Sequence, residues 1–235
     1  MSPFLGEFIG TMLLIIMGDG VVANVVLNKT KGNNSGWIVI TFGWAMAVFL
    51  GVYASNSLGG SGHLNPAVTI AMTAFSDFDP ALLPIYIGAQ FAGAITGAVV
   101  VWIAYKQHFD ATADGDSKLA VFCTGPAIRS SAHNLMTEII GTFVLAFGAL
   151  AMSKPASTLG TLDALPVALL VFGIGLSLGG PTGYAINPAR DLGPRIAHFI
   201  LPLKNKRNSD WAYSWIPIVG PVIGALIAVY LFKLI

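Results

Sequence analysis

The chain has 235 residues, of which 55% are hydrophobic and only 10% are charged, and its formal net charge at pH 7 is +1. Soluble domains usually carry about 25% charged residues, so this chain cannot cover a globular surface with polar groups and is predicted to lie in a lipid bilayer. A nearly neutral chain also lacks the basic surface that nucleic-acid binding requires.

Apolar segments follow one another along most of the chain. A membrane core of roughly 30 Å needs a helix of about 20 mostly apolar residues to cross it. In chain order, the segments long enough to cross are about 4–27, 37–57, 82–105, 133–153, 162–180 and 211–234. Two more apolar segments, about 65–75 and 187–200, are too short to cross, and each begins with Asn-Pro after a glycine-rich turn.

The two halves of the chain carry the same signals in the same order. The matching pairs are Glu7–Thr11 with Glu138–Thr142, Asn65-Pro66-Ala67 with Asn187-Pro188-Ala189, and Gly93 with Gly224. Each half contains three crossing helices, an odd number, so the two halves must lie in opposite orientations. This is the inverted-repeat organisation of many transport proteins, whose sites are built from interrupted helices near the midplane.

The domain organisation follows from this repeat. We expect a single domain over residues 1–235, with a first pseudo-repeat at about 1–108 and a second at about 133–235. A connecting loop at about 109–132 joins them. Glycines spaced four apart, such as Gly93/Gly97, are predicted to let neighbouring helices approach closely.

The two Asn-Pro-Ala boxes are predicted to start short helices inside the membrane. Asn is a favoured N-cap residue and Pro is favoured at the first helical position. Two such helices that enter from opposite faces would meet start to start, and each start carries roughly half a positive charge. The centre would therefore repel cations and hydronium, while the amides of Asn65 and Asn187 donate hydrogen bonds to a passing oxygen atom.

These boxes, the two Glu-x-x-Gly-Thr runs and the sequence Asn187-Pro188-Ala189-Arg190-Asp191-Leu192-Gly193-Pro194-Arg195 closely resemble the glycerol facilitators, or aquaglyceroporins, of the aquaporin superfamily. The resemblance covers nearly the whole chain. It implies an all-α membrane protein with the aquaporin fold, in which six transmembrane helices surround two re-entrant half-helices. It further implies a pore within each monomer, a homotetramer, and neither cofactor nor metal.

The resemblance also implies a selectivity filter of Trp44, Gly175, Tyr184 and Arg190, although Trp44 matches only if the turn before Asn65 holds one extra residue. Arg190 would offer fixed hydrogen-bond donors, and the two aromatic rings would face the carbon side of a polyol. For either ring, an ordinary core or interfacial position is the alternative. Tyr184 stands where the family usually has Phe, which we expect to make the ring more polar.

Further residues have supporting roles in this interpretation. The resemblance implies that Glu7 and Glu138 hold the re-entrant loops, and Asp191 follows the filter arginine as in the glycerol branch. His63 is expected at the inner mouth, with a hydrogen-bonded loop histidine as the alternative. Asp19 replaces the apolar residue expected in its helix, and we interpret it as a solvated vestibule position.

The family's orientation in the plasma membrane places both termini in the cytoplasm. The positive-inside rule predicts the reverse, because the basic residues gather in the expected outer loops, whereas the expected inner segments hold Lys154 and Lys233. The outer ones are Lys29, Lys31, Lys106, Lys118, Arg129, Lys204, Lys206 and Arg207. A basic outer mouth could concentrate small carboxylates near the pore.

The predicted function is a passive channel for water and small uncharged polar solutes, chiefly glycerol, with undissociated lactic acid as a second solute. The order of preference among glycerol, water, urea, dihydroxyacetone and lactic acid stays open. The alternative is a proton-coupled secondary transporter of small organic acids, which would need a titratable relay at the midplane. Neither a His-Glu-x-x-His nor a P-loop pattern occurs in the sequence, and an enzyme is not expected.

Overall fold

The structure, a computed structural model, describes residues 2–76, 78–152 and 160–235, so Lys154 lies outside the described residues. Within the described part, five helices are long and apolar enough to cross a membrane. They are α1 (Pro3–Val26), α2 (Trp37–Ser57), α4 (Leu83–Ala111), α6 (Ser131–Met152) and α9 (Ile216–Leu234).

The fifth predicted crossing contains a shorter helix than the sequence suggests. Helix α7 (Leu165–Leu178) has 14 residues, which is about 21 Å of rise, against the predicted span of 162–180. Pro166 lies in its first turn, where proline is tolerated, and the glycines that follow Leu178 end the helix. The 3-10 turn η2 (Gly160–Leu162) precedes α7 and extends this crossing.

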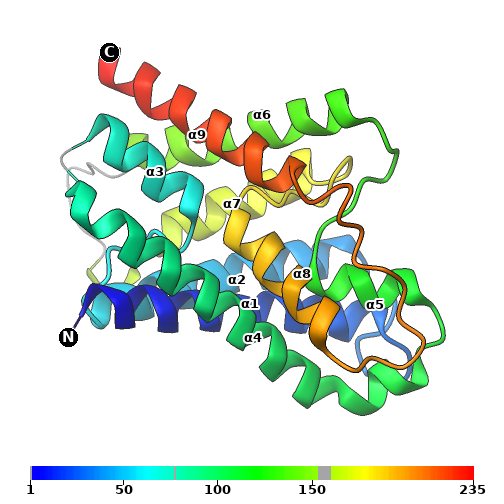
Figure 1. Cartoon of the computed structure of the whole chain (residues 1–235). Helices are drawn as coiled ribbons and strands as arrows, with labels where there is room; N and C mark the ends of the chain where they lie inside the picture. Colours follow the sequence, from blue (N-terminus) through cyan, green and yellow to red (C-terminus); the bar gives the residue numbers. More distant parts are fainter. Residues whose placement is uncertain (1, 77, 153–159) are drawn as a thin grey trace.

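The two half-helices begin at the predicted positions. Helix α3 (Pro66–Phe75) follows Asn65, whose side-chain oxygen accepts from Ala67 N at 3.0 Å. Helix α8 (Pro188–Ile200) follows Asn187 in the same way. Figure 1 shows α3 running toward the end of the molecule that holds both termini and α8 running toward the end that holds α5 (Gly115–Phe122).

The helix contacts repeat in the two halves. Helix α1 packs against α2 and α4, and α6 packs against α7 and α9 in the corresponding way. Each half-helix also contacts the last helix of the opposite half, α3 against α9 and α8 against α4 (Figure 1). The two halves are therefore interlocked around the half-helices.

Glycine permits the closest of these approaches. A Cβ atom at Gly93 of α4 would lie 2.4 Å from the carbonyl oxygen of Phe8 in α1. A Cβ atom at Gly224 of α9 would lie 2.3 Å from that of Ile139 in α6. Real Cβ atoms do not come this close, so both positions require glycine, as predicted for close helix packing in a membrane.

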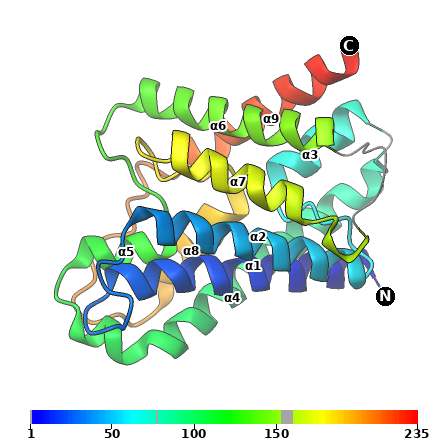
Figure 2. The ribbon, with the colours of Figure 1, turned by 180° about the vertical axis from the view of Figure 1, so that it is seen from behind.

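The connection between the two halves is more ordered than predicted. Helix α4 continues to Ala111, and α5 lies within the segment 109–132, which the sequence analysis describes as a loop. Asp114 caps α5 by accepting from the backbone N–H groups of Asp116 and Ser117. Its eight residues contain no long apolar run from which a helix could be predicted. Figure 1 and Figure 2 show α5 at the end of the molecule opposite the termini.

Large apolar side chains face outward along the crossing helices. This is expected where the surrounding medium is lipid, because hydrocarbon imposes no cost on exposed apolar groups. Among them are Ile38, Phe42, Ile103, Ile140, Leu169 and Tyr230.

Candidate pore and selectivity filter

The two Asn-Pro-Ala boxes meet inside the molecule and are joined by reciprocal hydrogen bonds. Asn65 Nδ2 donates to the carbonyl oxygen of Ile186 at 2.7 Å, and Asn187 Nδ2 donates to that of Leu64 at 2.8 Å. Each carbonyl belongs to the residue directly before the opposite box. Each amide nitrogen carries two N–H groups, so a second donor is left on both asparagines, whose side chains line a cavity.

The residue before each box has a left-handed backbone, with φ of 50° at Leu64 and 43° at Ile186. Such residues cost about 1–3 kcal/mol each when they adopt this conformation. A buried carboxylate holds each one in place: Glu7 Oε2 accepts from Leu64 N at 2.8 Å, and Glu138 Oε2 accepts from Ile186 N at 2.8 Å. A hydrogen bond to a charged group contributes about 1.5–3 kcal/mol, which offsets a strain of that size.

The remaining oxygen of each carboxylate repeats the same pattern, accepting one backbone N–H and one hydroxyl. The donors are His63 N and Ser55 Oγ for Glu7, and Ala185 N and Thr182 Oγ1 for Glu138. Both carboxylates are buried. Each therefore ties its own half's re-entrant loop to the first crossing helix of that half.

Two cavities meet at a ring of three side chains. The inner cavity, of about 340 Å³, is lined by both box asparagines. The outer cavity, of about 330 Å³, is lined by residues 123–127 of the connection after α5. Trp44, Tyr184 and Arg190 line both cavities, so these three predicted filter residues lie where the two spaces adjoin.

Arg190 is held on several sides at this ring. Its guanidinium carbon lies 3.9 Å from the centroid of the Trp44 ring, and Nη1 lies 3.4 Å from the carbonyl oxygen of Phe122. Nη1 also lies 3.6 Å from Asp19 Oδ1, in an ion pair between α8 and α1. Stacking and pairing together fix the plane of the guanidinium, and with it the direction of its donors.

The expectation for Asp19 is wrong. The position of Asp19 in the sequence favours a solvated vestibule residue, whereas its side chain is 0% exposed and faces Arg190. Its helix position alone could not show this, because the partner lies on a half-helix from the other half of the chain. The only sequence signal was the chemical oddity of a carboxylate in an apolar helix.

Tyr184 fills the space that Gly175 leaves. A Cβ atom at Gly175 would lie 2.8 Å from Tyr184 Cζ and 3.0 Å from its hydroxyl oxygen. That hydroxyl is buried and has no hydrogen-bond partner among the described residues. The expectation that Tyr184 makes the ring more polar is thereby corrected, because the hydroxyl lies against α7 and the aromatic ring lines the cavities.

Asp191 and Arg195 form a second buried pair, of which the sequence analysis singled out only Asp191. Arg195 Nη2 lies 2.8 Å from Asp191 Oδ1, and Thr124 donates its N–H and hydroxyl to Asp191 Oδ2 at 2.8 and 2.7 Å. Arg195 also donates to the carbonyl oxygens of Thr124 and Ser209. The i, i+4 spacing of Asp191 and Arg195 is the sequence feature from which this ion pair on α8 could have been predicted. Together they tie α8 to the two connections at the outer mouth.

His63 is hydrogen-bonded and lines a cavity, while its place at the inner mouth of the pore stays a prediction. It lines the inner cavity, and its Nδ1 lies 3.2 Å from Thr69 Oγ1. Its ring also contacts those of Phe78 and Tyr86, with centroids 4.9 and 5.2 Å away. Among the described residues, no three His, Cys, Asp or Glu side chains are placed to share a metal ion.

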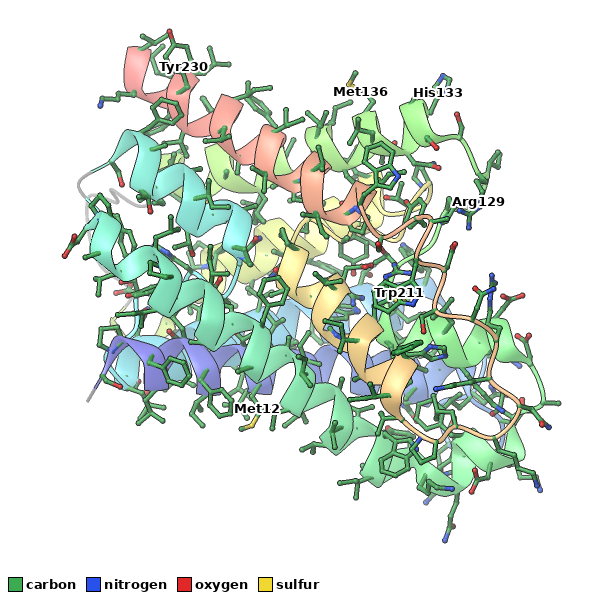
Figure 3. All side chains as sticks on the ribbon, in the orientation of Figure 1. Met12, Arg129, His133, Met136, Trp211 and Tyr230 are labelled. Carbon is green, nitrogen blue, oxygen red and sulfur yellow. The ribbon has the colours of Figure 1, made fainter. Side chains whose placement is uncertain are left out.

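Basic residues at the outer end are engaged in local contacts. Figure 3 shows Arg129 and Trp211 on the same side, on the connections before α6 and α9. Arg129 pairs with Asp210 there. Lys206 Nζ donates to three carbonyl oxygens at the end of α8, those of His198, Phe199 and Leu201, at 2.8, 2.7 and 2.7 Å. Burial lowers the pKa of Lys206 below its ordinary value.

Comparison with known proteins gives matches over nearly the whole chain. The family model described as "Major intrinsic protein" matches residues 1–232. The "Probable glycerol uptake facilitator protein" of Thermotoga maritima is 57% identical over 99% of both chains, and the "D/L-lactic acid transporter" of Lactiplantibacillus plantarum is 41% identical over 96% of this chain and 94% of that relative. Among solved structures, the aquaglyceroporin from Plasmodium falciparum superposes with a TM-score of 0.86 at 30% identity, covering 98% of this chain and 94% of that one.

Proposed function

Because this chain belongs to the major intrinsic protein family, we propose that it is a passive channel for glycerol and water across the plasma membrane. The observation that carries the proposal is the ring of Trp44, Tyr184 and Arg190, at which the two cavities meet. The probable glycerol uptake facilitator of Thermotoga maritima, which is 57% identical to this chain, supports glycerol as the solute.

The ring combines the two kinds of contact that a polyol needs. Arg190 presents fixed donors to solute hydroxyl oxygens, while the rings of Trp44 and Tyr184 contact the carbon backbone. Beyond the ring, the second N–H of Asn65 and of Asn187 donates to each passing oxygen in turn. The starts of α3 and α8 add positive potential at the same place and exclude protons and cations.

We further propose a homotetramer, with two pseudo-repeats in each subunit and a pore in each subunit. Both termini lie at the same end of the molecule in Figures 1 and 2. Within this proposal that end is cytoplasmic, so His63 lies toward the inner mouth and Gly175 supports the filter from behind Tyr184. Glu7, Glu138 and Asp191 hold the loops in shape.

A second solute is undissociated lactic acid. The lactic acid transporter that is 41% identical to this chain supports it, and so does the neutral midplane, where two carboxamides stand in place of a titratable relay. A proton-coupled transporter is the competing class. A coupled transporter needs a proton gradient, whereas a channel needs only the gradient of its solute.

Swelling of reconstituted vesicles, followed by stopped-flow light scattering, tests these proposals together. We expect glycerol to enter at least about tenfold faster than in protein-free vesicles, with no change when an uncoupler is added. Lactate uptake should rise as the external pH falls, because only the neutral acid crosses. A wild-type protein without glycerol flux would refute the glycerol channel, and loss of flux with the uncoupler would favour the coupled transporter.

A further inference from the structure

The carboxylate of Asp19 is placed as the counter-ion of the filter arginine. It is fully buried in α1, and neither of its oxygens has a hydrogen-bond partner among the described residues. Within the described part of the chain, it forms an ion pair with Arg190, at 3.6 Å. A buried carboxylate is costly unless a positive charge stands beside it, so this pair is the interaction that makes Asp19 tolerable in the helix.

The neighbouring charges are already matched. Asp191 pairs with Arg195 on α8 at 2.8 Å, and both side chains are fully buried. The two buried ion pairs at the ring therefore sum to zero, with two guanidinium groups and two carboxylates, while the nearby carboxylate of Glu138 is held by hydrogen bonds from Thr182, Ala185 and Ile186. Without Asp19 the sum would be +1, and the unmatched charge would lie on Arg190, at the constriction itself.

Helix α1 also positions the ring around this pair. A Cβ atom at Gly18 would lie 2.1 Å from the ring of Trp44, so glycine lets that ring lie directly against α1. The Arg190 guanidinium stacks on the same ring and reaches Asp19, the residue after Gly18. Gly18 and Asp19, which are neighbours on α1, thus position Trp44 and Arg190.

We propose that Asp19 is a specificity-determining and positioning residue, which holds Arg190 in place and cancels its charge so that the filter does not retain small carboxylate anions. The proposal rests on the proposed conduction of neutral solutes. In a filter with an unmatched guanidinium, an anion such as formate would bind at the constriction and obstruct it. In the neutral filter, solutes are held by hydrogen bonds alone and leave readily.

Asp19→Asn tests the proposal, because it removes the charge and keeps the shape of the side chain. Glycerol flux is measured in vesicles at neutral pH, with sodium formate or the sodium salt of a bulky sulfonate as the added salt. We expect formate to inhibit Asp19→Asn with an inhibition constant about tenfold below that of the wild type. Asp19→Glu, which keeps the charge, should resemble the wild type. Thr11→Val serves as the matched control, because it removes from α1 another buried polar atom for which the described residues offer no hydrogen-bond partner.

Equal inhibition by formate in the wild type and in Asp19→Asn, or in neither, would overturn the proposal. Should Asp19→Asn fail to fold, the double variant Asp19→Asn/Arg190→Gln decides: recovery of folded protein supports a charge pair, and continued failure contradicts it. The same salts are applied to water flux, so a protein that conducts no glycerol would refute the proposed solute while the formate comparison still decides the role of Asp19.

Discussion

At the residue scale, the shape of the constriction depends on the absence of a side chain at Gly175. Gly175 has no side chain, and the ring of Tyr184 lies in the space that a side chain would occupy. Tyr184 in turn packs edge-on against Trp37, with ring centroids 5.9 Å apart. The width of the passage therefore depends on an aromatic ring that can rest against the backbone of α7.

Gly175→Val should push this ring away from α7 and into the passage. We expect glycerol permeability to fall at least about tenfold while water permeability falls much less, because the wider solute meets the displaced ring first. The matched control is Gly173→Val on the same helix, where a Cβ atom would meet nothing within 4 Å. Equal losses in both variants, measured by stopped-flow swelling, would show that general damage to α7 is responsible.

At the element scale, short helices depend on their caps. The two half-helices begin at asparagines that cap them, and α5 begins at Asp114. A helix of eight residues has few internal hydrogen bonds, so its cap contributes a large share of its local stability. Hydrogen bonds from the Ser117 hydroxyl and from the N–H groups of Ser117 and Asp116 lower the pKa of Asp114 below its usual value.

Asp114→Ala should loosen α5 locally. We expect amide hydrogen exchange in Gly115–Phe122 to accelerate about three- to fivefold at neutral pH. In the wild type the lowered pKa means that this stabilisation is complete above the usual pKa of 3.8 and is lost as the pH falls further, through the lowered value. Asp79→Ala, which removes the cap of η1 (Pro80–Leu82), should leave α5 unchanged. Unaltered exchange in α5 of Asp114→Ala would contradict the capping role.

At the scale of the whole molecule, the basic residues at the end opposite the termini take part in contacts within the fold. Arg207 pairs with Asp116, and Lys106 pairs with Asp110. Lys118 donates to the carbonyl oxygen of Lys204, which joins α5 to the connection after α8. These contacts hold the connections at this end together, so the positions of these cations have a structural reason that is independent of the positive-inside rule.

Cysteine labelling in intact cells tests the orientation. The native Cys123 is buried, so introduced cysteines report alone. Lys204→Cys, on the exposed outer connection, should react with a membrane-impermeant maleimide in intact cells. Ile235→Cys, whose parent side chain is 92% exposed at the C-terminus, should react only after permeabilisation. The reverse pattern would place the termini outside and would agree with the charge count.

The sequence predicts best what is encoded locally. Asn-Pro marked both half-helices because capping and proline geometry act within a few residues of the chain. The ion pair of Asp19 with Arg190 could not be predicted, because its partners come from different halves and meet only in the folded chain. The direction of the Tyr184 hydroxyl was missed for the same reason, since Gly175 on another element determines it.

The reciprocal bonds between Asn65, Asn187 and the carbonyls before them also bear on biosynthesis. While the ribosome is still making the second half, the amide of Asn65 lacks the Ile186 carbonyl, and the first three inserted helices hold an unfinished lining. Maturation therefore waits for translation of α8. The hydrogen-bonded lining at the midplane is therefore completed only when both halves of the chain are present.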